Sequence, residues 1–336
     1  MTTAFRKPRR RLLTQAAALA AFTAAGFIGA LPAALAQAYP DKPVKVIVNF
    51  PAGGAADQIA RAITTPLSEV LGQSFVVENK SGAGGNIGGE AAARAPADGY
   101  TLLMSSGGMV AINPIIYKNM PFDPVKDLTP VAAAARVLLY LEVNPDKVPA
   151  KTVAEFIDYL KANPDKLSYS SPGNGSSPHL AGELFKERAG VTALHVPYRG
   201  AAPAMRDLLG GQVDFMFDPG IGLQNVDAGK LKLLAIGSPE RSPRYPDVPT
   251  LSEAGLDGFN ADSFFGFYAP AGTPPEIIKR LNTEINKIVN SPAFAEKLAN
   301  MGSVPAPMTP EEFGNKAHED AERFGKLIRD RGIMGG

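Results

Sequence analysis

The stretch Val44-Lys45-Val46-Ile47-Val48-Asn49-Phe50-Pro51-Ala52-Gly53-Gly54 decides the fold class. Its first five residues are mostly branched and apolar, which predicts a buried strand, and the proline and glycines that follow predict a turn. Residues 57–71 come next and predict a helix, because apolar residues recur on one helical face from Ile59 to Val70. A strand that leads through a short turn into a helix is the unit of an α/β fold.

The same unit recurs along the chain. Strands are predicted at 75–77, 101–104, 167–170, 213–217, 231–236 and 264–269, and helices at 88–95, 153–162, 201–209, 275–290, 292–300 and 310–330. Capping signals at Thr152, at Ser177-Pro178 and at Thr273 mark three helix starts. The alternation predicts an α/β architecture throughout.

Residues 1–38 predict a secretory signal peptide. A basic patch from Arg6 to Arg11 precedes a long apolar run from Leu12 to Ala36, and small residues follow. We expect cleavage after Ala36 or Ala38 and a location in the periplasm. Arg9-Arg10-Arg11-Leu12-Leu13 also fits a loose twin-arginine pattern. The Sec route is the expected one, and the twin-arginine route is the alternative.

The composition of the mature chain excludes several function classes. Without residues 1–38 the chain carries 29 basic and 33 acidic residues, a formal charge of −4, which gives no footprint for nucleic acid or an anionic membrane. The absence of cysteine excludes disulfides, thiolate catalysis and thiolate metal sites. No second long apolar run occurs, so we expect no membrane insertion after signal cleavage.

About 300 mature residues exceed the usual size of a single core, which predicts two lobes. Because no low-complexity linker separates them, we expect extended strands to cross between the lobes, at 138–143 and at 262–268. The first lobe would then be discontinuous, with residues 39–140 and 265–336, and the second lobe would span residues 141–264.

Four predicted strand-to-helix turns share a composition rich in glycine, serine and proline: residues 50–54, 81–86, 173–177 and 198–201. In an open α/β sheet such turns gather at the carboxyl ends of the strands, where ligands bind. Each directs backbone N–H groups and the positive end of a helix dipole toward the cleft, which suits an anion. Any one of them could be an ordinary turn, but four on one chain favour a shared anion site.

Support for catalysis is thin. A dinucleotide fingerprint that starts at Gly82 needs glycine at position 87, which is Ile87, and no Gly-Lys-Ser/Thr follows a glycine-rich loop. No Gly-x-Ser-x-Gly elbow and no His-x-x-x-His spacing occur. The sequence therefore favours a binding protein over an enzyme.

Three polar side chains each allow more than one interpretation. His179 could serve Ser176 as a base, but we expect it to face the cleft or to donate to a backbone carbonyl. Asp57 and Asp218 could be paired carboxylates for acid–base work. We expect Asp57 to cap its helix instead. Asp218 either points into the cleft or starts a turn.

Eight motifs, in order along the chain, identify a family resemblance: Tyr39–Pro43, Phe50–Gly54 with Asp57, Val77–Gly85, Asp98–Leu102, His179–Phe185, His195–Gly200, Asp207–Gly211 and Ala269–Pro274. Together they resemble the substrate-binding proteins of tripartite tricarboxylate transporters, the Bordetella uptake gene family. The resemblance covers residues 39 to about 330. It implies a type II periplasmic-binding-protein fold, with two α/β lobes that close around a ligand cleft.

The resemblance also implies the ligand, the partner and the site. Family ligands are mostly small organic carboxylates, and the partner is a membrane permease of two further subunits. We expect a monomer, and no cofactor or metal. The motifs place the ligand-binding residues at Phe50, Ala52, Gly53, Asp57, Ala83, Gly84, Ser105 and Ser106 in the first lobe and at Ser176, Ser177, His179, Tyr198 and Asp218 in the second.

Two departures bear on ligand identity. The family often has proline where this chain has Ala52, and tryptophan near Phe264, and we expect both positions on or near the cleft. If Asp218 faces the ligand, it would disfavour a second carboxylate. Two other functions remain open: a receptor that presents its closed form to a membrane sensor, and an exported enzyme on the same fold.

Overall fold

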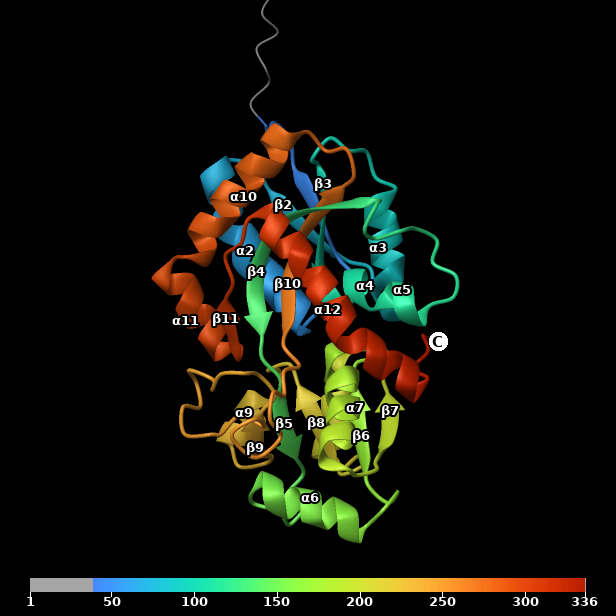
Figure 1. The fold of residues 1–336 in the computed structure, drawn as a ribbon. Helices are drawn as coiled ribbons and strands as arrows, with labels where there is room; N and C mark the ends of the chain where they lie inside the picture. Colours follow the sequence, from blue (N-terminus) through green and yellow to red (C-terminus); the bar gives the residue numbers. More distant parts are fainter. Residues whose placement is uncertain (1–38, 336) are drawn as a thin grey trace, which may run out of the picture. The chain divides into compact units, whose positions relative to one another are not determined.

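The structure is a computed structural model that describes residues 39–335. The predicted signal peptide, residues 1–38, lies outside the described residues. The chain from Lys42 onward forms one compact unit that contains two β-sheets (Figure 1). No helix in residues 39–335 has the length and apolar character needed to cross a bilayer.

The larger sheet has six strands in the order β11-β4-β10-β3-β1-β2. Their bounds are β1 Val44–Val48, β2 Phe75–Asn79, β3 Thr101–Ser106, β4 Leu128–Val137, β10 Ser263–Pro270 and β11 Ser303–Pro305. β1, β2 and β3 are parallel, whereas β10 runs antiparallel to both β3 and β4. The carboxyl ends of the three parallel strands therefore meet at one edge, together with the start of β10.

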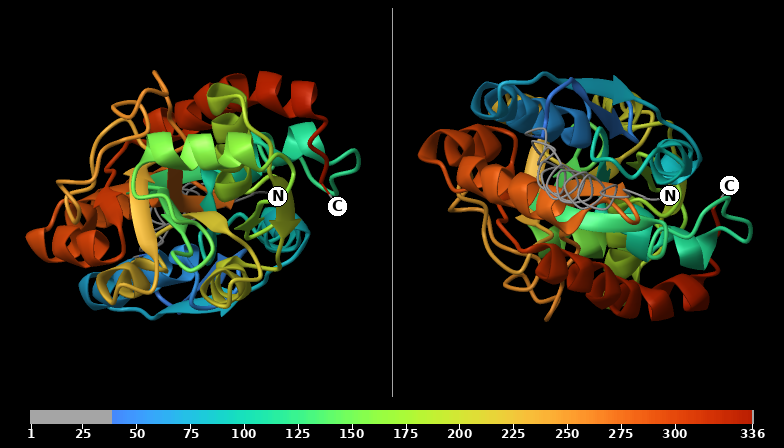
Figure 2. Two further views of the ribbon diagram at one scale, coloured as in Figure 1. Left: turned by 90° about the horizontal axis from the view of Figure 1, so that it is seen from below. Right: turned by 90° about the horizontal axis from the view of Figure 1, so that it is seen from above.

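Helices cover both faces of the larger sheet. They are α2 Ala55–Leu71, α3 Asn86–Ala93, α4 Gly107–Ala111, α5 Asn113–Ile116, α10 Pro275–Val289, α11 Pro292–Asn300 and α12 Pro310–Arg331, with the 3₁₀ turn η1 Ala83–Gly85 before α3. α2 packs on α10 and α11, while α12 packs on α4, and Figure 2 shows α2 in blue and α12 in red on opposite sides. The apolar faces of α3, α4, α5 and α12 enclose the core around Ile47, Leu103 and Phe313.

The smaller sheet has five strands in the order β7-β6-β8-β5-β9. The elements of this part are β5 Tyr140–Val143, α6 Val153–Ala162, β6 Ser168–Ser171, α7 Ser177–Ala189, β7 Leu194–Pro197, α8 Ala201–Leu209, β8 Phe215–Asp218, α9 Leu223–Asp227 and β9 Lys232–Ile236. Its core includes the aromatic rings of Phe156, Phe185 and Phe215, whose centroids lie 5.1 to 6.5 Å from one another. Each sheet thus has a hydrophobic core of its own.

The chain changes sheets at the end of β4. Only Leu138 and Leu139 separate β4 from β5, and the segment between β9 and β10 leads back to the larger sheet (Figure 1). The first connection lies within the crossing predicted at 138–143. The second, residues 237–262, consists of turns and bends, and β10 lies wholly in the larger sheet, so no extended strand crosses between the sheets at 262–268. The assignment of lobes to residues 39–140 with 265–336 and to residues 141–264 stays a prediction.

Three local predictions are wrong in detail. Ser177-Pro178 was predicted to start α7, but the N-cap is Ser176 and Ser177 is already the first helical residue. Pro178 is tolerated there because the N–H groups of the first two helical positions have no acceptor within the helix. Thr273 does not cap α10, because its hydroxyl donates to the Pro270 carbonyl at 2.7 Å. β3 continues through Ser105 and Ser106, because β10 pairs with both.

Candidate functional site

A pocket lies where the two sheets meet, with a free volume of about 700 Å³ including its open mouth. The larger sheet contributes the loop that joins β1 to α2, the end of β3 and the start of β10. The smaller sheet contributes the loops that lead into α7 and α8, together with Pro219 after β8.

Three helices begin at the pocket wall. The wall includes Gly54 and Ala55 at the start of α2, Ser176 and Ser177 at the start of α7, and Gly200 and Ala201 at the start of α8. The first N–H groups of a helix have no acceptor within that helix, and the helix dipole adds positive potential there. The wall is therefore suited to an anion without any arginine or lysine side chain.

The strand β10 forms an apolar part of the wall. Ser263 and Phe265 lie two residues apart and face the pocket together, and Phe265 pairs across the sheet with Ser106 of β3. The rings of Phe265 and Phe50 have centroids 6.3 Å apart. Phe264, between the two pocket residues, faces the other way.

Phe264 lines a second, charged pocket with Arg136, Asp262, Lys316 and Arg323. The expectation that Phe264 lies on or near the cleft is therefore wrong. The physical reason is the two-residue repeat of a strand, which places neighbouring side chains on opposite faces of the sheet.

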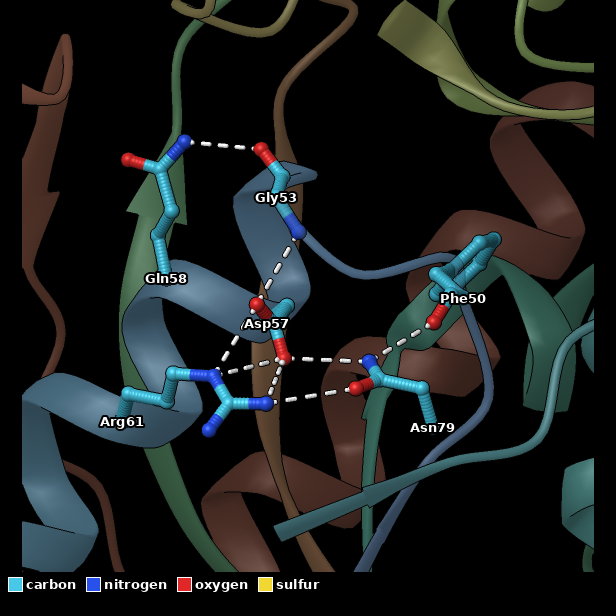
Figure 3. A network of polar contacts seen from close by, with 6 residues as sticks. All are labelled: Phe50, Gly53, Asp57, Gln58, Arg61 and Asn79. Atoms are coloured by element: carbon cyan, nitrogen blue, oxygen red, sulfur yellow. Dashed lines mark hydrogen bonds and ion pairs between the residues drawn. The ribbon is translucent and has the colours of Figure 1, made fainter.

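Asp57 holds the loop between β1 and α2 in place (Figure 3). One of its carboxylate oxygens accepts from the Gly53 N–H at 3.0 Å, and the other accepts from the Asn79 amide at 3.0 Å. Arg61, one turn further along α2, donates to both oxygens. Burial raises the pKa of Asp57, but the hydrogen bonds from Arg61, Gly53 and Asn79 outweigh it and hold the pKa below its ordinary value.

His179 acts on the loop before α7 in a similar way. Its Nδ1 accepts from the Gly175 N–H at 3.0 Å, and its ring stacks on the ring of His195 with centroids 3.7 Å apart. His195 in turn lies 2.6 Å from the Ser171 hydroxyl. Burial, followed by the charge of Lys186, lowers the pKa of His179 to about 4, so the ring is neutral near pH 7.

Asp218 ends β8 beneath the pocket and is fully buried. One of its oxygens accepts from the N–H groups of Gly220 and Gly222, each at 2.8 Å, so the residue starts a turn. Burial raises the pKa of Asp218 to about 7, although the two N–H groups oppose that shift. Burial and the charge of Asp218 raise the pKa of Glu142, which is also fully buried.

A neighbouring pocket shares Phe50, Pro51, Pro172 and Gly200 with the first. The glycine-rich loop 81–85 forms one side of it, and Tyr198 and the exposed Arg199 form the other. The side-chain amide of Asn49, the residue after β1, donates to the Gly85 carbonyl of this loop at 3.2 Å and to the Ser105 hydroxyl at 2.9 Å. The neighbouring pocket is thus the more polar continuation of the first.

The structure divides the predicted ligand-binding residues into three groups. The first pocket is lined by Phe50, Ala52, Ser106, Ser176 and Ser177, and the neighbouring pocket is lined by Phe50, Ala83, Gly84 and Tyr198. Neither pocket is lined by Gly53, Asp57, Ser105, His179 or Asp218. Gly53 is exposed in the loop between Ala52 and Gly54, whereas the other four are buried. Three of these four, Asp57, His179 and Asp218, accept hydrogen bonds from loop N–H groups. A direct ligand contact for the five has no support in the geometry.

Sequence reasoning missed part of the wall. Ser263 and Phe265 of β10, Val137 at the end of β4, and Leu139 line the first pocket close to where the chain passes between the sheets. All but Val137 lie in the segments 138–143 and 262–268 that were predicted as crossings. Nothing in the sequence indicates which face of each strand meets the ligand.

Comparisons with known proteins find relatives along most of the chain. The family model described as the tripartite tricarboxylate transporter family receptor matches residues 59–333. Protein BugT of Bordetella pertussis is 38% identical over 300 residues, which cover 88% of this chain and 91% of BugT.

Two solved structures from Rhodopseudomonas palustris are similar along most of their length. Rpa4515 with adipate is 37% identical, with a TM-score of 0.85, and the match covers 88% of this chain and 99% of that one. MatC with bound malate is 31% identical, with a TM-score of 0.79, and the match covers 86% and 100%. The likeness to solved periplasmic binding proteins confirms the predicted type II fold.

Proposed function

The chain belongs to the tripartite tricarboxylate transporter receptor family, and on that premise we propose that it captures a small carboxylate outside the cytoplasmic membrane. Members of this family are solute-binding receptors. The proposal adds the chemical class of the solute, the place of capture and the fate of the bound form.

One observation carries the proposal: α2, α7 and α8 all begin at the wall of one pocket that lies between two sheets. Backbone N–H groups at these three starts can bond a carboxylate directly or through ordered waters. The similar proteins that hold adipate and malate support the same class of ligand.

The proposed site consists of the residues that line the two adjoining pockets: Phe50, Ala52, Ala83, Gly84, Ser106, Ser176, Ser177 and Tyr198. Gly53, Asp57, Ser105, His179 and Asp218 belong to it as positioning residues. Asp57 and His179 each accept a loop N–H and so hold the loops whose backbones face the ligand.

Capture is proposed to proceed by closure of the two sheets on the ligand. Loops from both sheets already approach each other, since a Cβ on Gly200 would lie 3.0 Å from the Pro51 ring. The short strand connections at Leu138-Leu139 and before Ser263 would bend during this movement.

Delivery of the bound acid to a two-subunit membrane permease is the proposed outcome, by a monomer in the periplasm. A receptor role, in which a membrane sensor reads the closed form, is the alternative. Deletion of the permease genes distinguishes the two, because it abolishes uptake of the acid in the first case and leaves the response to the acid intact in the second.

The proposal is tested by a thermal-shift screen of the mature protein against mono-, di- and tricarboxylic, aromatic and amino acids. A ligand at about 100 times its Kd stabilises the folded state by roughly 2.7 kcal/mol, which raises the Tm measurably. Protein that has been unfolded, dialysed and refolded removes any co-purified ligand. If no acid then raises the Tm, the proposal is wrong. Formation of a product from the bound acid would instead identify an enzyme.

A further inference from the structure

We infer that the ligand carries one carboxylate on a largely apolar body, and that the pocket rejects a second carboxylate. The inference rests on the proposed function, because it assigns the carboxylate to the wall formed by the three helix starts. It goes further by assigning the rest of the ligand to the apolar side chains of the pocket.

The first pocket has no charged side chain on its wall. Its lining consists of alanine, glycine, proline, serine, valine, leucine and phenylalanine residues. A carboxylate at the helix starts is matched by N–H groups, but an anion on the β10 side would meet Val137, Leu139 and Phe265. Burial of an ion without a partner costs several kcal/mol, whereas burial of an apolar group carries no such penalty.

Ser106 provides an independent sign that a polar ligand group belongs in this pocket. Its side chain lines the pocket, the residue is only 7% exposed, and its hydroxyl has no hydrogen-bond partner within the protein. Ser106 and Ser177 also line a smaller adjoining pocket, so both lie on the wall near the start of α7. A hydroxyl at the pocket wall without a partner in the protein is free to donate to a bound carboxylate.

The apolar part of the wall is formed by the rings of Phe50 and Phe265 and by the side chains of Val137 and Leu139. Ser263, 3% exposed and also without a side-chain partner, is the one polar group beside them among the lining residues of β10. A hydroxyl can bond a water or a neutral oxygen of the ligand, but it cannot neutralise a second carboxylate.

The cations nearest to the site are accounted for elsewhere. Arg61 pairs with Asp57 and bonds Asn79. Arg136 faces the other side of β4 and pairs with Glu240 and Asp262. Arg199 lines the neighbouring pocket but is exposed, so water screens its charge. A long diacid that reached Arg199 is the specific alternative to the inference.

Matched pairs of acids test the inference. Butanoate and succinate, hexanoate and adipate, octanoate and suberate, and benzoate and terephthalate differ within each pair by one carboxylate. Isothermal titration at about pH 7.5 with ligand-free mature protein measures each Kd, and both carboxylates of the diacids are ionised at that pH. We expect the monoacid to bind at least about 100-fold more tightly in each pair that binds at all. Monomethyl adipate, which keeps the length but loses the second charge, should recover most of the affinity of hexanoate.

A diacid that binds as tightly as its monoacid overturns the inference and leaves the proposed function standing. Failure of every mono-, di- and tricarboxylic acid to bind overturns the proposed function itself. Loss of diacid binding in Arg199→Met, with monoacid binding unchanged, identifies the long diacid as the ligand and also overturns the inference.

Ser106→Ala should weaken the preferred monoacid about 10-fold, because the hydroxyl bonds a charged group. Ser303→Ala is the matched control, since Ser303 is 2% exposed, has a hydroxyl without a partner and lies in β11 away from the pocket. Equal affinities of the two variants would show that the Ser106 hydroxyl does not bind the ligand.

Discussion

Phe264 and Phe265 are consecutive residues of β10 and line two different pockets. Phe265 lies opposite Ser106 and contacts the ring of Phe50 in the uncharged pocket, whereas Phe264 lies opposite Arg136 among charged side chains. Lys316 lies over the Phe264 ring, 5.7 Å from its centroid. One strand therefore contributes to two chemically distinct surfaces.

Phe265→Leu is expected to weaken binding of the preferred acid about 5- to 10-fold, because it removes the aromatic contact with Phe50 and part of the apolar wall. Phe264→Leu is the matched control on the same strand, and its Kd should stay within about twofold of the wild type. Titration calorimetry on the two variants measures both. A larger effect from Phe264→Leu would mean that the ligand occupies the charged pocket.

Asp57→Asn is expected to lower the free energy of unfolding by at least about 1 kcal/mol, because it removes the ion pair with Arg61 and weakens the bond from the Gly53 N–H. The folded pKa of Asp57 is depressed. Its contribution is therefore present above the ordinary carboxyl pKa near 4 and is lost as the pH falls through the folded value. Urea unfolding at about pH 7 and about pH 3 should show the larger difference at the higher pH.

The control for Asp57 is Glu78→Gln, which breaks the surface pairs of Glu78 with Lys45 and Lys80. Such exposed pairs contribute about 0 to 1 kcal/mol. If both variants lose the same stability, the buried carboxylate has no special role in the loop.

Glu142→Gln is expected to gain stability relative to the wild type as the pH rises. Burial raises the pKa of Asp218 to about 7 and also raises the pKa of Glu142. A raised folded pKa contributes stability that is present below the unfolded value near 4 and is lost as the pH rises through the folded value. The amide cannot ionise, and it removes one charge from beside Asp218.

Urea unfolding at about pH 5 and about pH 8 measures this effect. The free energy of unfolding of the variant, relative to that of the wild type, should rise by more than about 1 kcal/mol from the lower pH to the higher. Glu296→Gln, at an exposed position, is the control and should change little. Parallel pH curves for Glu142→Gln and the wild type would show that the two carboxyl groups do not interact.

Gly220→Ala is expected to destabilise the turn beside the pocket strongly. Gly220 and Gly255 both have φ near +99°, but a Cβ on Gly220 would lie 2.1 Å from the Met301 carbonyl oxygen, whereas one on Gly255 meets nothing within 4 Å. The left-handed backbone conformation should lower the free energy of unfolding of both variants by about 1–3 kcal/mol. Gly220→Ala should lose a further 1–3 kcal/mol or so for the contact. Equal losses in urea unfolding would mean that the backbone conformation alone matters.

The sequence alone predicted much of the architecture. Strands at 44–48, 101–104 and 231–236 and helices at 153–162, 201–209 and 292–300 follow from local periodicity, which the structure keeps within a few residues. The short elements α4, α5, α9 and β11 were not predicted, because three to five residues give too little periodic signal. Their positions depend on what they pack against.

The sequence by itself determined the α/β alternation, the glycine- and serine-rich turns that present N–H groups, and the family, because each depends on residue types at fixed spacing along the chain. Only the tertiary structure decided which of Phe264 and Phe265 meets the ligand, and that Asp218 lies beneath the pocket beside Glu142. A two-residue repeat shows that neighbouring side chains face opposite ways, but not which way is inward. The pairing of Phe265 with Ser106 settles that, and it joins positions more than 150 residues apart in the chain.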